Sequence, residues 1–319
     1  MAISALDNKV EAIMCLEDTS GVFKTPVAAD KNFPLGKVEA NIETRNAEGL
    51  RGADGKFSPA RMFQTGLLGT LTIPSSMMKV DDITVATGAI ELTPLFSLSG
   101  FQEIVNGDNR ELFYNGDGNC ATGSMRFFNK GCGSSSEGLG TDFRGIHGSL
   151  TIEAETAGAE FKVNFEGQAA IEGTPDTTKT SISSGYDNDA ATRATELFIG
   201  SVEVDSVATD VEKLSIAMNV ELKERKSPED GKNGIDFIYE ADIKPTVSIT
   251  APLGADTSTW WPNVIAGNVI PTLTYTGTYW DFALTDLVIN SMAREADGQI
   301  SLTQELSPTT ILLVPKAVA

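Results

Sequence analysis

Residues 211–252 decide the fold that the sequence predicts. The first part, 211–225, reads VEKLSIAMNVELKER, and the last part, 235–252, reads IDFIYEADIKPTVSITAP. Apolar and polar residues alternate in both, which is the pattern of a strand with one buried face and one wet face. The connecting segment 226–234, KSPEDGKNG, holds one proline and two glycines, which are turn residues. The stretch therefore predicts a long β-hairpin with an extended, charged tip.

Residues 38–74 repeat this arrangement. They read VEANIETRN, then the loop AEGLRGADGKFSPA, then RMFQTGLLGTLTIP. A short candidate helix follows each hairpin, at 93–100 and at 261–267, with proline near its start and glycine at its end, the usual asymmetry of helix termini. Further strands follow each helix. We therefore predict a duplicated unit of hairpin, short helix and hairpin; the alternative is a chance likeness between β-rich segments.

The predicted organisation has four parts. They are an N-terminal strand and arm at 1–37, a first unit at 38–171, a polar linker at 172–210 and a second unit at 211–319. Residues 150–166 predict a second hairpin in the first unit, because apolar and polar residues alternate on both sides of a turn. Residues 101–144, rich in Gly, Asn, Asp and Ser, are interpreted as an inserted loop region with one or two short strands. The latter part of the linker, 196–207, is a candidate for a further strand.

The composition limits the classes of function. The chain has 319 residues and a formal net charge of −20, from 44 acidic and 24 basic residues. Such a surface repels nucleic acid and argues against a protein that wraps around it. The three cysteines, Cys15, Cys120 and Cys132, show no CxxC spacing, so free thiols are favoured, although Cys120 and Cys132 could pair. No membrane helix and no signal peptide is predicted.

Residues that could carry catalysis are scarce. The single histidine, His147, has no nucleophile motif beside it and is interpreted as a turn histidine. A glycine- and serine-rich stretch matches no phosphate-binding motif, and the acidic turns at 117–119 and 187–189 lack the spaced ligands of a calcium loop. The aromatic pairs at 260–261 and 279–280 are suited to stacking on sugars, to a core or to an interface. We expect no catalysis, no metal and no cofactor.

Several segments, taken in order, match a known pattern. These are KVEAIMCLEDTSGVFKTP (9–26), GLLGTLTIP (66–74) with its downstream helix, FRGIHGSLTIEAETAGAEFKVNFEGQAAI (143–171), ADIKPTVSITAP (241–252) and DGQISLTQEL (297–306). In this order the chain resembles the tail tube, or major tail, proteins of long-tailed bacteriophages. The resemblance covers nearly the whole chain through motifs that are individually weak, and residues 101–144 depart from it.

The resemblance implies a mainly β fold of duplicated β-sandwich or half-barrel units, with one short helix each. Such units join edge to edge into a ring with a continuous inner β-barrel, so that assembly consumes exposed strand edges. It implies a ring of three chains with pseudo-sixfold symmetry, a hexamer being the alternative, and stacked rings through which DNA passes without specific binding. The implied partners are other copies, a tape-measure protein and a tail terminator, without a membrane. The implied location is the virion tail, assembled in the cytoplasm of the host bacterium.

Two sets of residues are candidate sites in such a tube. Acidic residues on the polar strand faces would line the channel and repel DNA: Glu153, Glu155, Glu166, Asp236, Glu240 and Asp242. Both hairpin tips carry mixed charges, which suit contacts between rings. The tip residues are Glu48, Arg51, Asp54, Lys56, Glu224, Arg225, Lys226, Glu229, Asp230 and Lys232.

Two other functions stay open. The first is another virion or secretion-tube component of the same fold, such as a tail terminator or a secreted hexameric tube protein. The second is a β-sandwich module that binds glycans through its tryptophans.

Overall fold

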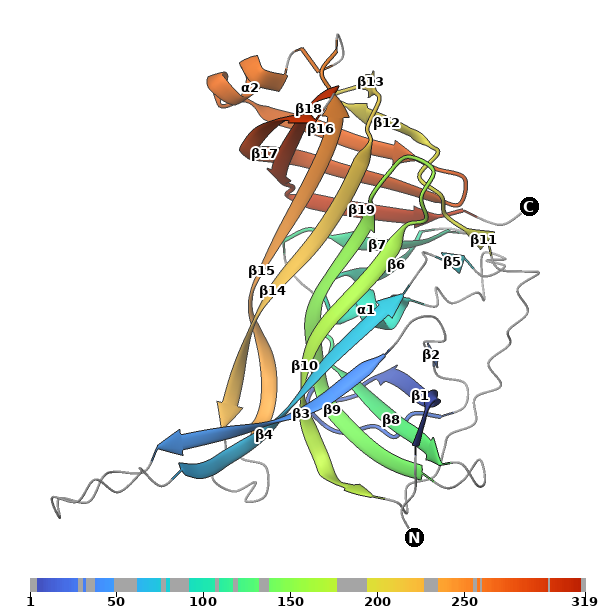
Figure 1. Ribbon diagram of the computed structural model, residues 1–319, viewed down its shortest axis with the longest axis vertical. Coiled ribbons are helices and arrows are strands. Elements are labelled where there is room, and N and C mark those ends of the chain that lie inside the picture. Colours follow the sequence, from blue (N-terminus) through green and yellow to red (C-terminus); the bar gives the residue numbers. More distant parts are fainter. Residues whose placement is uncertain are drawn as a thin grey trace, which may run out of the picture.

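The chain is mainly β, as predicted, with two short helices in its described part (Figure 1). The computed structural model describes residues 5–27, 31–32, 38–48, 62–75, 79–80, 92–106, 109–116, 120–131, 138–176, 194–226, 235–254, 257–258, 260–297 and 299–316. Seventeen of the strands in these ranges form one large antiparallel sheet. Neither helix in these ranges is long and apolar enough to cross a membrane.

The elements fall into two halves. The first half contains β1 (Ala5–Leu16), β2 (Lys31–Asn32), β3 (Glu39–Glu48), β4 (Met62–Ser75), β5 (Lys79–Val80), α1 (Thr93–Ser97), β6 (Gln102–Asn106), β7 (Asn109–Tyr114), β8 (Gly123–Gly131), β9 (Gly138–Ala154) and β10 (Lys162–Asp176). The second half contains β11 (Ala194–Thr195), β12 (Ser201–Val204), β13 (Val207–Thr209), β14 (Lys213–Lys226), β15 (Ile235–Pro252), α2 (Trp260–Ala266), β16 (Val269–Thr276), β17 (Trp280–Asp297), β18 (Gln299–Ser307) and β19 (Thr310–Pro315). The helices predicted at 93–100 and 261–267 are α1 and α2, and the strand expected within 196–207 is β12.

The two halves have the same strand order. In the first half the order is β3-β4-β10-β9, and in the second it is β14-β15-β18-β17. The correspondence extends to a neighbouring set of strands, β1-β8-β9 and β12-β16-β17. The pairing is also irregular at the same place, beside Gln168–Ala170 in the first half and beside Glu305–Leu306 in the second. The hairpin echo in the sequence therefore corresponds to a repeated topology.

The halves are joined edge to edge. β14 pairs antiparallel with the end of β9, from Leu214 opposite Ala154 to Met218 opposite Leu150. The earlier part of β9 pairs on that same edge with β8, and Gly145, with a φ of 58°, marks the change of partner. Between the two partners the backbone N–H of Gly148 donates to the carbonyl that follows α1, at 3.2 Å. The sheet is therefore continuous across the chain (Figure 1).

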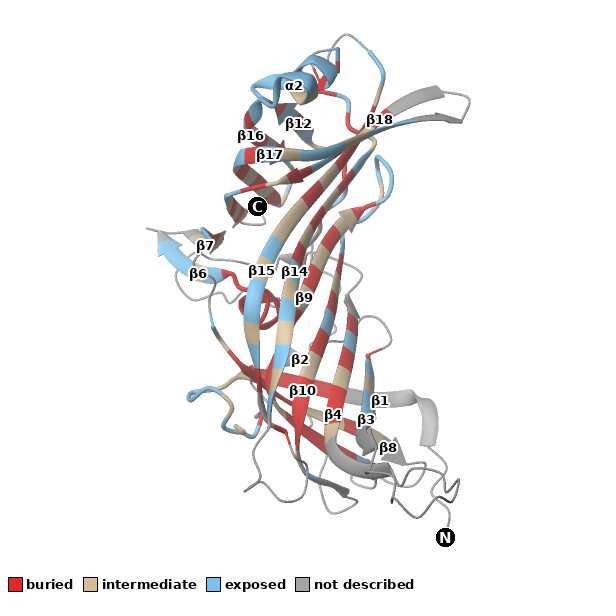
Figure 2. Cartoon of the chain, turned by 90° about the vertical axis from the view of Figure 1, so that its left-hand side faces the viewer, coloured by how far each residue is buried: buried red, intermediate tan, exposed pale blue. Residues whose placement is uncertain are grey.

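One hydrophobic core extends through both halves. Buried and less buried residues alternate over 149–154 of β9, 162–169 of β10, 213–219 of β14 and 246–249 of β15, as the period-two pattern predicts (Figure 2). At one end of the core the Phe161 ring meets Phe198, Tyr275 and Phe282 with centroids 5.5, 5.3 and 5.4 Å apart. Edge-on aromatic contacts of this kind add to the free energy gained from burial. The cluster fixes the second half against the turn between β9 and β10.

Residues 101–144 are not mainly loop, which corrects the sequence interpretation. They form β6, β7, β8 and the beginning of β9. One of the glycines that suggested a loop serves close packing instead: a methyl group at Gly138 would lie 2.1 Å from the Asn129 carbonyl oxygen. The hairpin β6–β7 pairs with β19 and so connects the two halves. The predicted linker is also shorter than expected, because β10 continues to Asp176.

Candidate functional site

The surface that the repeated strands present opposite the core is polar. We call it the polar face; it belongs to the sheet β3-β4-β10-β9-β14-β15-β18-β17. Its side chains form rows across neighbouring strands, because residues opposite one another share a face. One row crosses six strands: Lys162, Glu153, Ser215, Ser248, Glu305 and Ser291. The adjacent row on the core side is apolar throughout: Val163, Ile152, Ile216, Val247, Leu306 and Ile289.

Hydroxyl, amide and carboxylate groups dominate the polar face. The amide of Asn164 donates to the Glu153 carboxylate at 2.9 Å, and the Ser291 hydroxyl donates to the Glu305 carboxylate at 3.0 Å. Glu166 is exposed, opposite Thr72 on β4. The described part of the face carries these carboxylates beside the cationic side chains of Lys162 and Lys213.

The residues predicted to line a channel do not all lie on this face. Glu153 and Glu166 do, while Glu155 is in the turn after β9, with its carboxylate 3.5 Å from the Lys162 ammonium. Asp242 is exposed on β15, and a hydrogen bond from Lys244 lowers the pKa of its carboxyl group. The Asp236 side chain lies outside the described residues.

Glu240 is buried instead of lying open on the polar face, and the turn interpretation of His147 is wrong. His147 is in the interior of β9, and its Nδ1 lies 3.0 Å from Oε1 of Glu240 on β15. The two side chains are only 4% and 7% exposed. The Glu240 carboxylate is therefore largely covered in the described part of the chain. The pair attaches β15 to β9, across 93 residues of sequence.

The pair belongs to a contact between an arm and the sheet. We call the outer part of the hairpin β14–β15, residues 220–226 and 235–243, the arm. A small apolar cluster joins the arm to β4 and β10, through Leu68, Ala170, Ile235 and Ile238 with Leu222 packed beside them. The backbone N–H of Val220, where the arm begins, donates to the Ser149 hydroxyl at 3.0 Å. The arm is therefore fixed against the first half near the polar face.

The predicted tip residues lie largely outside the described part of the chain. This holds for Arg51, Asp54, Lys56, Glu229, Asp230 and Lys232. Glu48 ends β3, and Glu224, Arg225 and Lys226 end β14. In Figure 1 the described ends of the hairpins β3–β4 and β14–β15 point to the same side of the molecule, at the lower left.

Two strand edges of the repeated sheet end without a partner strand in the described part of the chain. β3 pairs there only with β4. β17 pairs with β16 as far as Val288, and beyond that residue its described pairing is with β18 alone. Open edges favour pairing with another chain. The sequence predicted the hairpins, but it gave no signal for which strand edges lack a partner strand within the described part of the chain.

Glu196, which lies within the predicted polar linker, has a structural role that its sequence did not indicate. Its side chain is fully buried and accepts three hydrogen bonds, from the Tyr275 hydroxyl at 2.6 Å and from the backbone N–H groups of Thr278 and Tyr279 at 3.1 and 2.6 Å. Burial and the bond to Glu196 raise the pKa of Tyr275 well above its usual range. The Glu196 carbonyl also accepts from the N–H of Phe161 at 3.1 Å. This residue therefore ties the linker to both halves.

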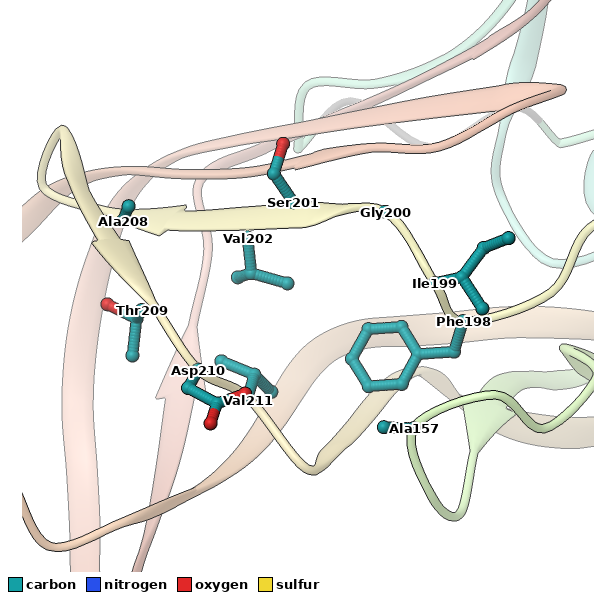
Figure 3. A pocket seen from close by; sticks show the side chains of 10 residues that line it. All are labelled: Ala157, Phe198, Ile199, Gly200, Ser201, Val202, Ala208, Thr209, Asp210 and Val211. Carbon is teal, nitrogen blue, oxygen red and sulfur yellow. The ribbon is translucent and has the colours of Figure 1, made fainter.

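Two cavities in the described part of the chain each have a single ionisable residue in their lining. One of about 400 Å³ lies between the turn at Ala157 and β12–β13, where Phe198 and Val202 point into it (Figure 3). Asp210 is the one ionisable residue in its lining. Another, of about 420 Å³, lies between the arm and the polar face and has Glu166 as its one ionisable group. The described residues contain no group of three or more His, Cys, Asp or Glu side chains that could hold a metal ion.

The structure also shows how far the predicted aromatic pairs and two of the cysteines are buried. Trp260 and Trp280 are buried in the core, while Trp261 is 53% exposed. Neither pair thus forms a flat exposed platform for a sugar. Cys15 is buried, with its thiol 3.7 Å from the Lys24 carbonyl, and Cys120 is an exposed free thiol. Pairing of Cys120 with Cys132 stays a prediction, because Cys132 lies outside the described residues.

The chain was also compared with known proteins. No protein-family model matches it, and no curated protein matches it.

Proposed function

We propose that this chain is a structural protein that polymerises into stacked rings, as tail tube proteins of long-tailed bacteriophages do. Each half would be one tube unit. The sheets of three chains would close into a ring with six units around a channel. The proposed site is the virion tail, after assembly in the host cytoplasm, and the proposed partners are further copies, a tape-measure protein and a tail terminator.

The junction between β9 and β14 carries the proposal. It joins two sheets of identical strand order edge to edge, and it leaves β3 and β17 as the edges of the combined sheet. β3 is the counterpart of β14, and β17 is the counterpart of β9. The two open edges of the combined sheet are therefore equivalent to the two edges that pair with each other at the junction between β9 and β14. Repeating that contact between chains gives a head-to-tail assembly, which closes into a ring where the rotation allows.

The polar face supports the proposed channel. One polar row crosses six of the repeated strands, and Glu153, Glu166 and Glu305 give the face acidic groups. A channel wall of this kind repels the phosphates of passing DNA. The alternative of another tube component with the same fold rests on the same junction. The glycan-binding alternative has less support, because Trp260 and Trp280 are buried.

Electron microscopy of the concentrated protein tests the proposal. We expect rings or tubes with a central channel. Particles that stay single at all concentrations would contradict it, and binding on a glycan array would then favour the module that recognises sugars. Rings that never stack into tubes would favour the first alternative, another component of the same fold.

A further inference from the structure

The open edge of β17 lies beside an exposed apolar surface around α2. All five residues of α1 are buried, whereas in α2 Trp260 alone is buried. Trp261 and Ile265 on α2 are 53% and 75% exposed. Val269 and Val288, opposite one another on β16 and β17, are 47% and 52% exposed. Exposed apolar groups gathered in this way mark an interaction surface.

The ends of the two helices show what the second one lacks. After α1, Gly100 has a φ of 96°, and a methyl group on it would lie 2.6 Å from Cδ1 of Ile243 on β15. After α2, Gly267 has a φ of 64°, and no atom of the described residues lies within 4 Å of such a methyl group. The first helix therefore ends against the hairpin of the following half. The second ends in open space at the equivalent position.

The internal junction also supplies a register. The prolines that end the second strand of each hairpin, Pro74 and Pro252, align the two halves. Thr44 is opposite Leu67, and Met218 is opposite Pro245; each of these partners is seven residues before its proline, so Thr44 corresponds to Met218.

The same alignment applies to the other side of the junction. Leu150 is opposite Phe165, and Phe165 is opposite Ile73, the residue before the first proline. Arg294 is opposite Leu302, and Leu302 is opposite Ala251, the residue before the second proline. Arg294 therefore corresponds to Leu150, which is the internal partner of Met218.

We propose that the β17 edge and α2 together bind the β3–β4 hairpin of a second copy, with Thr44 of that copy opposite Arg294 and Ile42 opposite Ala296. The inference rests on the proposed ring assembly and specifies its contact. Ile42, 40% exposed on the core side of β3, becomes covered as Ile216 is covered in the internal junction. Trp261 and Ile265 then lie towards the second copy's β4, in the way that α1 lies towards β15.

A disulfide cross-link tests the register. Thr44→Cys and Arg294→Cys are introduced into a chain whose Cys120 and Cys132 are replaced by serine. Residues directly opposite on antiparallel strands have Cα atoms about 4.5–5.5 Å apart, within the range that a disulfide spans. The matched control pairs Thr44→Cys with Met292→Cys, two residues out of register. After oxidation of assembled protein we expect two- and three-chain species on a non-reducing gel, about tenfold more than in the control.

The outcomes separate the register from the assembly. If rings form but the Thr44→Cys/Arg294→Cys variant does not cross-link, the proposed register is wrong and ring assembly is still supported. The same conclusion follows if the shifted control cross-links to the same extent. A parent chain that never assembles refutes the proposed function and this inference with it.

The α2 surface is tested by Ile265→Glu, with Val105→Glu on β6 as the matched control, since Val105 is 63% exposed. We expect both variants to be soluble, with the far-ultraviolet circular dichroism of the parent. The control should assemble normally, while Ile265→Glu should stay monomeric at the concentration where the parent forms rings. Assembly of Ile265→Glu equal to that of the control excludes α2 from the contact.

Discussion

Glu196→Gln is the substitution that most sharply tests how the linker holds the two halves together. The carboxylate accepts from Tyr275 and Thr278 on one oxygen and from Tyr279 on the other. A glutamine has one oxygen and one NH₂ group in this place. Whichever way the amide points, its NH₂ group faces a backbone N–H, and at least one donor to the buried Glu196 side chain loses its partner.

The expected cost follows from those bonds. A buried donor without a partner costs about 1–3 kcal/mol, and the loss of the charge weakens the bonds that stay, so we expect a decrease of about 2–4 kcal/mol in the free energy of unfolding. Equilibrium urea unfolding followed by tryptophan fluorescence measures it. Glu203→Gln, on the exposed side of β12, is the matched control and should change the free energy by less than about 0.5 kcal/mol. A Glu196→Gln variant as stable as this control would refute the assignment of Glu196 as the anchor of the linker.

Three further predictions concern the arm, the channel and the tips. Glu240→Ala leaves His147 buried without its partner and should destabilise the chain by about 1–3 kcal/mol in the same assay, whereas Asp242→Ala, on the exposed side of β15, should change little. Replacing Glu153, Glu166 and Glu305 together by lysine should make assembled rings bind duplex DNA in a gel-shift assay, because each cation can contact a phosphate; the same change at Glu160, Glu203 and Asp210, which are exposed outside the strands of the polar face, should not. Replacing residues 226–233 by an Asn-Gly turn should give folded monomer that polymerises poorly, and normal tubes from it would place the contact between rings elsewhere.

The strands of the repeated sheet were predictable because their energetics are local. Alternation of apolar and polar residues reports directly which side of a strand is buried, so β9, β10, β14 and β15 could be located before the structure. The same holds for α1 and α2, which are bounded by proline and glycine. β6, β7 and β8 were harder, because glycines selected for close strand packing resemble those of loops.

The long-range contacts could not be predicted from one sequence. Glu196 lies in a polar segment and finds its donors 79 to 83 residues away. His147 lies between Ile146 and Gly148 and meets Glu240 only because the arm packs against the first half. Neither contact leaves a periodic signal. Glu153 and Glu166 alternate with apolar residues along their strands and lie on the polar face, whereas Glu240, in the arm, is buried against His147.

The number of chains in one ring tests the central claim most directly. If each half is one tube unit and the β9–β14 junction is repeated between chains, six units around the channel require three chains. Native mass spectrometry of isolated rings, or a microscopy average made without imposed symmetry, counts them. Three chains per ring, with the two halves alternating around the channel, is the predicted result. A ring of six chains would contradict the equivalence of the two halves.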